Sequence, residues 1–411
     1  MPTQNPLSQW RETVSMAFPK LSRPQTTVLA LWSYGMVLAK SCGLTSVCAA
    51  LALQTGASES PLTQRLREWC YEAKDKKGTK RQSLDVTTCF APLLAWVLSW
   101  WPADERRLAL AIDASTLTQR FTVLCVSVLY RGCAIPVAWK IVVADEKGSW
   151  QPYWKALLTH IHAAVPDGWT VLVLSDRGLY ARWLYTHIVS LGWHPFMRIN
   201  QQGHFRPLTE KLFRGLSTAV PEVKGAWCGE IECFSERDSR LSCTLLACWE
   251  EGYHEVWLVV TDLAPEEADV VWYGMRSWIE GGFKDSKRGG WQWHQTKMVD
   301  PARAERIWLA IAVATVWVLS VGGQADATVP VSGLEALPAT HIARLTASKR
   351  SRPRMLSCFA RGWLLIVGAL MRGEGLLLGH FVPELWSSSS PVPKKPTKKK
   401  RAAHLALKAA S

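Results

Sequence analysis

Apolar positions in the first part of the chain recur with the spacing of helices. The apolar segments are separated by short turns that contain glycine, such as Gly43 and Gly56. A spacing of three and four residues between apolar positions is typical of amphipathic helices that bury one face. The arrangement of two short helices around a turn is compatible with contact to DNA. Helices are predicted at 26–40, 45–54, 58–71 and 92–102.

After about residue 105 the apolar residues form continuous runs, which is typical of buried strands. Arg131 and Gly132 separate two of these runs and predict a hairpin turn. The predicted order β-β-β-α-β-α-β indicates a mixed α/β sheet. The strands are expected at 108–112, 121–130, 134–143, 169–174 and 194–199, and the helices at 150–165 and 179–191.

The second half of the chain predicts an insertion, a core helix and a basic tail. Short strands at 225–234, 240–249 and 254–261 make 200–263 a β-rich insertion. The nearly charge-free run 307–323 is at the short limit for a membrane span, and a buried core helix explains it better. The predicted domains are a helical N-terminal DNA-binding region (1–104), a catalytic core (105–325), a helical C-terminal region that could dimerise (326–386, helix at 339–378) and a disordered basic tail (387–411).

The charge balance indicates a polyanionic partner. The chain has 48 Lys and Arg against 34 Asp and Glu, a net charge of +14, and 23 tryptophans. This composition favours nucleic acid over the alternative of an anionic membrane surface. The 11 cysteines include no C-x-x-C pair, and the N-terminus lacks the apolar stretch of a secretory signal. We therefore expect reduced cysteines, a cytoplasmic, nucleoid-associated protein and no membrane partner.

Three acids are candidates for a metal site. Asp113 ends the apolar run LALAI, Asp176 follows WTVLVLS, and Glu280 lies on a predicted helix after the insertion. Carboxylates on rigid elements can bind two divalent cations, which activate an attacking oxygen and stabilise a leaving oxygen in phosphodiester cleavage. Rival acids are Asp262, which ends the run WLVVT, and Asp145 and Asp285.

The helix predicted at 273–287 would bring a concentrated set of charges to one face. On an ideal helix the members of this set fall within an arc of roughly 80°. A solvated face with Glu–Lys pairs four residues apart is the alternative explanation. Gly281 and Gly282 would weaken such a helix by about 1 kcal/mol each. The set consists of Tyr273, Arg276, Glu280, Lys284 and Lys287.

These motifs resemble those of bacterial insertion-sequence transposases of the DDE class, whose catalytic core is RNase H-like. The matching segments are LALAIDAST, VLVLSDRGLYA and a Tyr-x₂-Arg-x₃-Glu-x₆-Lys pattern (the YREK motif). The resemblance covers roughly residues 105–320. It implies an α/β fold with an RNase H-like mixed sheet, a β-rich insertion, and helical regions before and after it.

The resemblance also implies a function and residue roles. The chain would cleave transposon ends and transfer the 3′-OH into target DNA, in some relatives through a hairpin, as a homodimer on double-stranded DNA with inverted repeats. Two Mg²⁺ ions, for which Mn²⁺ can substitute, would be held by Asp113, Asp176 and Glu280. Tyr273, Arg276 and Lys287 would bind DNA phosphates, and Lys284, which lies outside the family pattern, would be a supporting contact. A tryptophan of the insertion, Trp227, Trp249 or Trp257, would support a flipped base unless it is part of the core.

Two other functions remain open from the sequence. An RNase H-like nuclease would cut without joining, and a domesticated DNA-binding protein would have lost catalysis. Residues Trp291 and Trp293 could stack on DNA, but core packing is the preferred interpretation.

Overall fold

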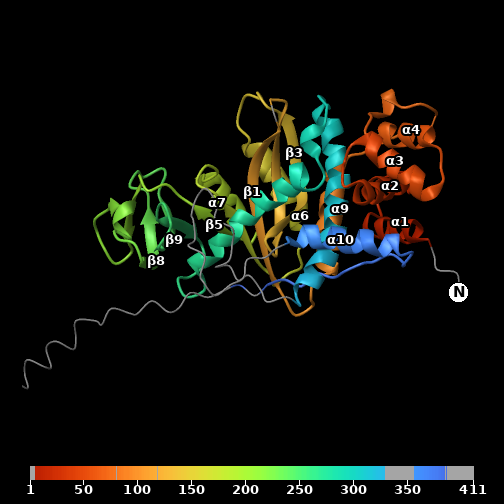
Figure 1. Cartoon of the computed structure of the whole chain (residues 1–411). Helices are drawn as coiled ribbons and strands as arrows, with labels where there is room; N and C mark the ends of the chain where they lie inside the picture. Colours follow the sequence, from red (N-terminus) through yellow and green to blue (C-terminus); the bar gives the residue numbers. More distant parts are fainter. Residues whose placement is uncertain (1–4, 80, 118, 329–355, 385, 387–411) are drawn as a thin grey trace, which may run out of the picture.

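The computed structural model of the chain has a β-sheet at its centre, a helical region at one end and a β-rich extension at the other (Figure 1). In the described residues, ten strands form one sheet in the order β3-β2-β1-β4-β5-β10-β9-β8-β6-β7. This confirms the predicted α/β class with a mixed sheet flanked by helices. The structure describes residues 5–79, 81–117, 119–328, 356–384 and 386.

The strands of the core lie where the apolar runs predicted them. β1, β2 and β3 form an antiparallel meander. Arg131 and Gly132 both have positive φ, 46° and 77°, as a two-residue hairpin turn of the primed type requires. β4 and β5 run parallel to β1. These strands are β1 (Arg107–Leu117), β2 (Phe121–Tyr130), β3 (Cys133–Val143), β4 (Thr170–Ser175) and β5 (His194–Arg198).

Helices follow and cover these strands. α6 (Gln151–His162) leads from β3 towards β4, and α7 (Arg182–Ser190) connects β4 to β5. Both begin and end within a few residues of the predicted bounds. Parallel strands need such crossover connections, so α7 places the carboxyl ends of β4 and β5 at the same edge of the sheet.

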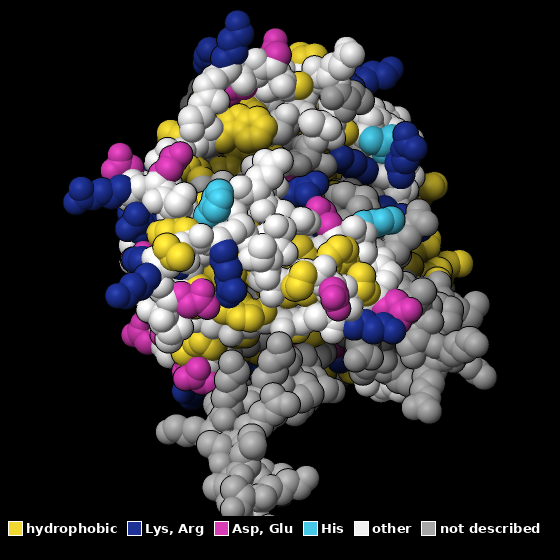
Figure 2. All heavy atoms as spheres, turned by 90° about the vertical axis from the view of Figure 1, so that its left-hand side faces the viewer, with side chains coloured by type: hydrophobic (Ala, Val, Ile, Leu, Met, Phe, Trp, Pro, Cys, Tyr) yellow, Lys and Arg dark blue, Asp and Glu magenta, His cyan; other side chains and the backbone are white. Residues whose placement is uncertain are grey.

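The predicted insertion continues the same sheet. β10 (Trp257–Thr261) lies antiparallel beside β5, and the remaining strands add to it one after another. Figure 2 views this end of the molecule and shows acidic, basic and apolar side chains interspersed over it. This face of the extension therefore carries no surface patch of only positive or only negative charge. Its other strands are β6 (His204–Pro207), β7 (Arg214–Gly215), β8 (Gly225–Cys233) and β9 (Leu241–Trp249).

A long apolar helix, α9 (Pro301–Asp326), joins the sheet to the helical region. By length and composition it could cross a membrane, but 94% of its most apolar stretch is buried inside the protein. The N-terminal helices pack near it, and Trp10 of α1 stacks on Trp317 of α9 at 4.5 Å between ring centroids. The helical region contains α1 (Pro6–Ala17), α2 (Arg23–Ala39), α3 (Leu44–Thr55), α4 (Glu59–Trp69) and α5 (Phe90–Ser99).

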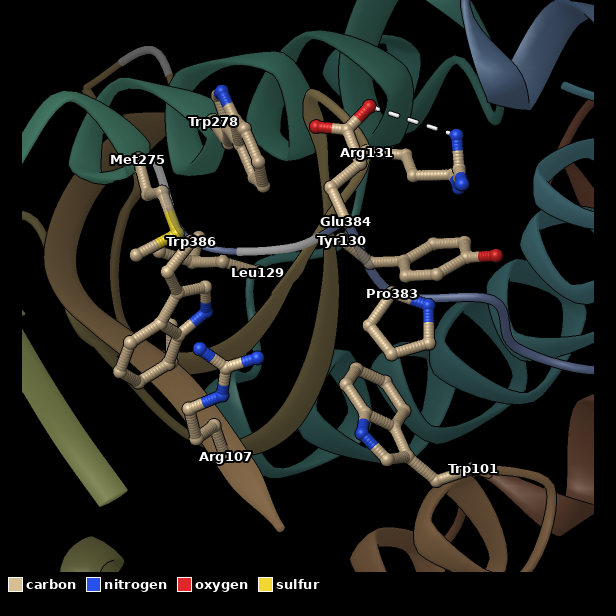
Figure 3. A pocket seen from close by; sticks show the side chains of 11 residues that line it. Trp101, Arg107, Leu129, Tyr130, Arg131, Met275, Trp278, Pro383, Glu384 and Trp386 are labelled. Carbon is tan, nitrogen blue, oxygen red and sulfur yellow. Dashed lines mark ion pairs between the residues drawn. The ribbon is translucent and has the colours of Figure 1, made fainter. Parts of the chain in front are cut away.

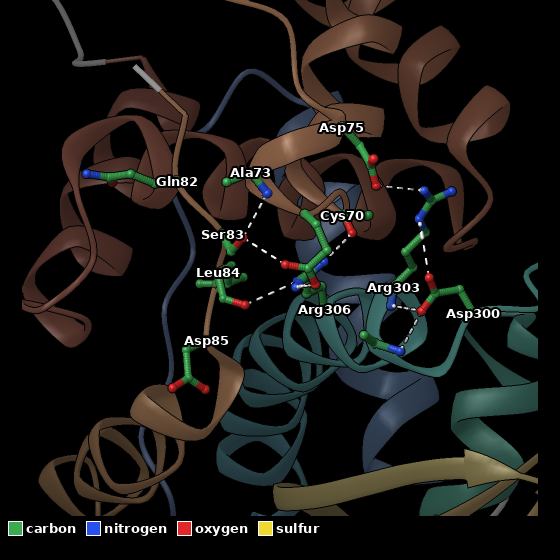
Figure 4. Close-up of polar contacts among 12 residues, drawn as sticks. Cys70, Ala73, Asp75, Gln82, Ser83, Leu84, Asp85, Asp300, Arg303 and Arg306 are labelled. Atoms are coloured by element: carbon green, nitrogen blue, oxygen red, sulfur yellow. Dashed lines mark hydrogen bonds and ion pairs between the residues drawn. The ribbon is translucent and has the colours of Figure 1, made fainter. Parts of the chain in front are cut away.

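A buried arginine on α9 fixes the loop that follows α4. Arg306 is 5% exposed and donates hydrogen bonds to the carbonyl oxygens of Cys70 (2.7 Å) and Leu84 (3.1 Å). It also pairs with Glu72. Figure 4 shows Arg306 beside Cys70 and Leu84. A guanidinium has five donors in a fixed fork, so one side chain can satisfy several acceptors of an irregular segment.

The C-terminal part returns across the molecule. α10 (Cys358–Met371) lies within the predicted 339–378 and packs against α9. A Cβ on Gly322 of α9 would lie 1.9 Å from the carbonyl oxygen of Cys358, so only glycine allows this contact. The first part of the predicted range, up to residue 355, and the basic tail from 387 are outside the described residues.

Candidate active site

Two aspartates meet at the edge of the sheet where β1 and β4 separate. The parallel pairing of β1 with β4 runs as far as Ala111 and Leu174, and Asp113 and Asp176 each lie two residues beyond it. The prediction that a strand ends at Asp113 was wrong. β1 continues to Leu117 because β2 still pairs with it, so Asp113 is held inside a strand.

The prediction of one continuous helix over 273–287 was also wrong. A 3₁₀ segment (Val270–Ser277) leads into the short helix α8 (Trp278–Lys284), and a π-helical turn follows (Asp285–Gly289). Lys287 has non-helical angles, φ −91° and ψ −113°. The predicted set of charges is therefore divided among three successive segments, with Arg276 on the first, Glu280 and Lys284 on α8 and Lys287 at a kink in the third.

Two glycines let α8 approach the sheet. A Cβ on Gly281 would lie 3.0 Å from the carbonyl oxygen of Gly132, and one on Gly282 would lie 2.8 Å from the Cβ of Ala134. Real Cβ atoms essentially never approach as closely as 2.8 Å and rarely as closely as 3.0 Å, so a larger residue, above all at Gly282, would push α8 away from the β2–β3 turn. The two glycines lower the stability of the helix, but they allow α8 to pack closely on the sheet and so bring Glu280 to the two aspartates.

The opposite side of this segment is covered by the C-terminal chain. Figure 3 shows Met275 and Trp278 facing Trp386 across a small pocket. Glu384 pairs with Arg131 of the hairpin turn at 3.6 Å, and the backbone N–H of Val382 donates to the Tyr130 hydroxyl at 2.9 Å. The segment that carries Glu280 is therefore fixed on both sides.

Arg276 lies at the centre of the three acids. Its guanidinium is 2.8 Å from Asp113 Oδ2, 2.8 Å from Glu280 Oε1 and 3.4 Å from Asp176 Oδ2. The Arg276 side chain is only 3% exposed. The structure thus brings together all three predicted acids around one predicted phosphate-binding residue.

Burial and charge change the acidity of Asp113. Burial raises the pKa of its carboxyl to about 6, Arg276 opposes this shift, and the neighbouring Asp176 adds to it. Three carboxylates and one guanidinium carry a net charge of 1 − 3 = −2 when all are ionised. The cluster therefore favours a further cation.

The three carboxylates are suitable ligands for a hard divalent metal ion, but in this structure they surround the guanidinium of Arg276. Mg²⁺ and Mn²⁺ prefer carboxylate oxygens of this kind. In the part of the chain that the structure describes, no three Asp, Glu, His or Cys side chains are grouped closely enough to hold one ion. Asp113, Asp176 and Glu280 fit the metal chemically once Arg276 moves from between them.

The remaining predicted residues take separate positions. Lys287 donates to Ser115 Oγ (2.7 Å) and to the carbonyl oxygen of Thr116 (2.8 Å) at the end of β1, and burial lowers the pKa of its ammonium. Tyr273 is buried, and burial raises the pKa of its hydroxyl. Lys284 is exposed on the outside of α8.

Among the rival acids, Asp262 lies at the opposite edge of the sheet. Its Oδ1 is 3.1 Å from His194 Nδ1 at the start of β5. Asp285 is mostly buried, and burial raises the pKa of its carboxyl to about 7. Neither acid is among the three that Arg276 joins.

The tryptophans are largely structural. Trp291 and Trp293 are buried, as the core interpretation predicted. Trp257 is 7% exposed and packs edge-on against Tyr273, with centroids 5.1 Å apart. Trp227 and Trp249 are half-buried on β8 and β9.

Sequence reasoning missed a second polar cluster beside the acids, formed by Arg177, Arg198 and Glu255. Arg177 directly follows Asp176, and Arg198 is the last residue of β5. Both pair with Glu255, which precedes β10. The signal in the sequence is the position of Arg177 and Arg198 at or just after strand ends, next to the predicted acid Asp176 in the case of Arg177.

Comparison with known proteins identifies the family. The model of the transposase DDE domain matches residues 107–317, slightly more than half of the chain. A solved structure, the cryo-EM structure of a piggyBac transposase synaptic complex with hairpin DNA, is similar at 10% identity with a TM-score of 0.36, covering 76% of this chain and 71% of that chain. No curated protein matches the sequence. The family match confirms an enzyme of DNA transposition that depends on divalent metal ions, and the chain belongs to the DDE transposase family.

Proposed function

We propose that this transposase cuts DNA at the ends of its element and joins the freed 3′-OH to target DNA, with Asp113, Asp176 and Glu280 as ligands of two Mg²⁺ ions. The observation that carries the proposal is the meeting of three carboxylates from β1, the end of β4 and α8 on one guanidinium. Rigid elements hold all three acids, as a two-metal centre requires.

The chain's own residues would have distinct tasks. Bound metal ions supply Lewis-acid activation of the attacking and leaving oxygens. Arg276 leaves the carboxylates when they are neutralised in this way, and its guanidinium then binds a phosphate of the DNA as a bidentate donor. Lys287, fixed at the end of β1, binds a neighbouring phosphate, and Lys284 adds a solvent-exposed contact.

The wider assembly belongs to the same proposal. The helical N-terminal region would bind the inverted repeats, and two copies would hold two ends as a homodimer. The reaction would take place in the cytoplasm on the nucleoid. Cleavage through a hairpin is the variant that the resemblance of the YREK motif supports, and Mn²⁺ would replace Mg²⁺ in activity.

Cleavage and joining of a labelled duplex test the proposal. The substrate carries the terminal inverted repeat that flanks the coding region, and Mg²⁺ is supplied. Asp113→Asn, Asp176→Asn and Glu280→Gln are each expected to lose activity by about a thousandfold or more, because the ligands act as one unit. Asp262→Asn is the matched control, since this acid lies at the opposite edge of the sheet.

The outcomes separate the candidate functions. If the three variants cleave like the wild type, the assignment of the acids is wrong. Products that are cut but never joined would support a nuclease without strand transfer. Binding without cleavage by the wild type would instead support a domesticated DNA-binding protein.

A further inference from the structure

A second basic cluster flanks the three acids on the side of the β-rich extension. Both carboxylate oxygens of Glu255 accept hydrogen bonds from Arg177 Nη1, at 3.0 and 2.9 Å. Glu255 Oε1 also lies 2.8 Å from Arg198 Nη2. One carboxylate therefore serves two guanidiniums, which leaves one positive charge in excess.

The two arginines differ in their freedom to move. The Arg198 side chain is 3% exposed and also donates to the carbonyl oxygen of Val256 at 3.4 Å. The Arg177 side chain is 52% exposed, and Glu255 is the acid with which it pairs in the described part of the chain. Arg198 is a fixed partner of Glu255, whereas Arg177 can leave it at little cost because exposed ion pairs are weak.

The sheet places this cluster in line with the acids. β1, β4 and β5 are parallel neighbours, so Lys287 beside β1, Asp176 after β4 and Arg198 at the end of β5 share one edge. Neighbouring strands are about 4.8 Å apart, so this row spans about 10 Å. One DNA strand carries a phosphate per about 3.4 Å of helix axis, so the row matches a few successive phosphates.

A buried hydroxyl, that of Tyr273, is influenced by the charges of both clusters. The Tyr273 side chain is 2% exposed, and its hydroxyl has no hydrogen-bond partner among the described residues. Tyr273 interacts electrostatically with both Arg276 and Arg198. A buried donor without a partner is costly, so its neighbourhood is suited to an acceptor that the protein itself does not provide.

We infer that Arg177 is a further DNA-phosphate contact of the active site, held on Glu255 in the free protein and transferred to the DNA when it binds. Glu255, which Arg198 holds in place, binds Arg177 in the free protein and competes with the DNA phosphate for it. This inference rests on the proposed function. It adds a basic contact on the β5 side of the acids, opposite to Lys287.

The test measures DNA binding without cleavage. Fluorescence anisotropy of a labelled duplex with the terminal inverted repeat is recorded in Ca²⁺, over a range of salt concentrations. Arg177→Ala is expected to weaken binding about tenfold and to reduce the slope of log K against log salt by about 0.9, the contribution of one phosphate contact. Arg177→Lys keeps the charge and should restore the slope but only part of the affinity.

The control is Arg107→Ala. Arg107 is also a half-exposed arginine paired with a glutamate, Glu105 at 2.8 Å, but it lies at the other end of β1. Its removal should leave both affinity and slope unchanged. The Arg177→Ala variant should unfold at the same temperature as the wild type within 2–3 °C, since an exposed ion pair contributes at most about 1 kcal/mol.

Glu255→Gln distinguishes a DNA contact from a merely structural pair. With the competing acid neutralised, Arg177 is free for phosphate, and binding should tighten about threefold, the size expected for a half-exposed ion pair. Unchanged affinity and slope in Arg177→Ala would overturn the inference. Weaker binding in Glu255→Gln would assign the cluster a structural role and also overturn it. A wild-type protein that binds no end DNA would instead overturn the proposed function.

Discussion

Replacement of Arg276 by glutamine would remove the cation that the three carboxylates share. The guanidinium is buried and lies within 2.8–3.4 Å of all three acids. In the metal-free protein we expect this variant to be less stable than the wild type. With divalent metal present we expect most of the difference to disappear, because the ion supplies the missing positive charge.

The size of the effect follows from burial. Loss of one partner from a buried ion pair costs about 3–5 kcal/mol, and the partial exposure of the acids places Arg276 near 3 kcal/mol. Unfolding entropy is about 2.1 cal/mol/K per residue, so for a chain of this length 3 kcal/mol lowers the unfolding temperature by about 3–4 °C. Mn²⁺ should bind the variant at least tenfold more tightly, which corresponds to about 1.4 kcal/mol.

The stability of the folded protein depends on pH through the Asp113 carboxyl. The pKa of Asp113 in the folded protein, about 6, exceeds that of an unfolded aspartate, so the folded protein binds this proton more tightly. Stability is therefore lost as pH rises from about 4 to 6. Arg276 lowers the pKa of Asp113, so the Arg276→Gln variant should have a higher Asp113 pKa and should continue to lose stability at higher pH than the wild type does. The variant should differ most from the wild type at pH 8 and least at pH 5.

Thermal unfolding in EDTA at pH 5 and pH 8, followed by titration with Mn²⁺ in a calorimeter, measures these quantities. Arg107→Gln is the control, since Arg107 pairs with a glutamate far from the acids. Equal unfolding temperatures for Arg276→Gln and wild type at pH 8, with equal Mn²⁺ affinity, would refute the reasoning. The guanidinium would then not hold the acids together in solution.

Three further predictions concern other residues. Asp285→Asn should stabilise the protein more at pH 8 than at pH 5 in thermal unfolding, because a folded pKa of about 7 makes stability fall as pH rises from the pKa of an unfolded aspartate, about 4, to about 7; equal effects at both pH values would contradict this. Lys287→Met should weaken end-DNA binding about tenfold and lower its salt slope by about 0.9, and an unchanged slope would exclude a phosphate contact. Deletion of residues 391–411, which contain six basic residues between Lys394 and Arg401, should lower the salt slope of non-specific DNA binding by up to about 5.

Local patterns were sufficient for most of the fold. The apolar runs predicted the core strands to within a few residues, except that β1 continues to Leu117, and the Arg131–Gly132 turn predicted the β2–β3 hairpin. Burial and turn chemistry are encoded over short stretches. The acids could be predicted for a related reason. Residues just beyond the pairing of two parallel strands share one edge of the sheet, so Asp113 and Asp176 were expected near each other, although Asp113 lies inside β1 and does not end it.

Contacts between distant segments could not be predicted in this way. The helical wheel assumed ideal geometry for 273–287 and missed the 3₁₀ and π-helical turns on either side of α8. Nothing local indicates the contact of Arg276 with Asp113, 163 residues earlier. The pairing of Arg177 with Glu255, 78 residues apart, was missed for the same reason.

The stacking of Trp10 on Trp317 has a consequence for biosynthesis. These residues are made 317 − 10 = 307 positions apart, and at ribosomal rates of 5–20 residues per second α9 emerges about 15–60 s after α1. During that interval the N-terminal helices lack the surface that buries their aromatic face. Further contacts arrive even later, since Gln9 accepts a hydrogen bond from Leu376 at 3.1 Å. The region made first thus matures last, and a nascent transposase exposes an apolar surface until nearly the whole chain has left the ribosome.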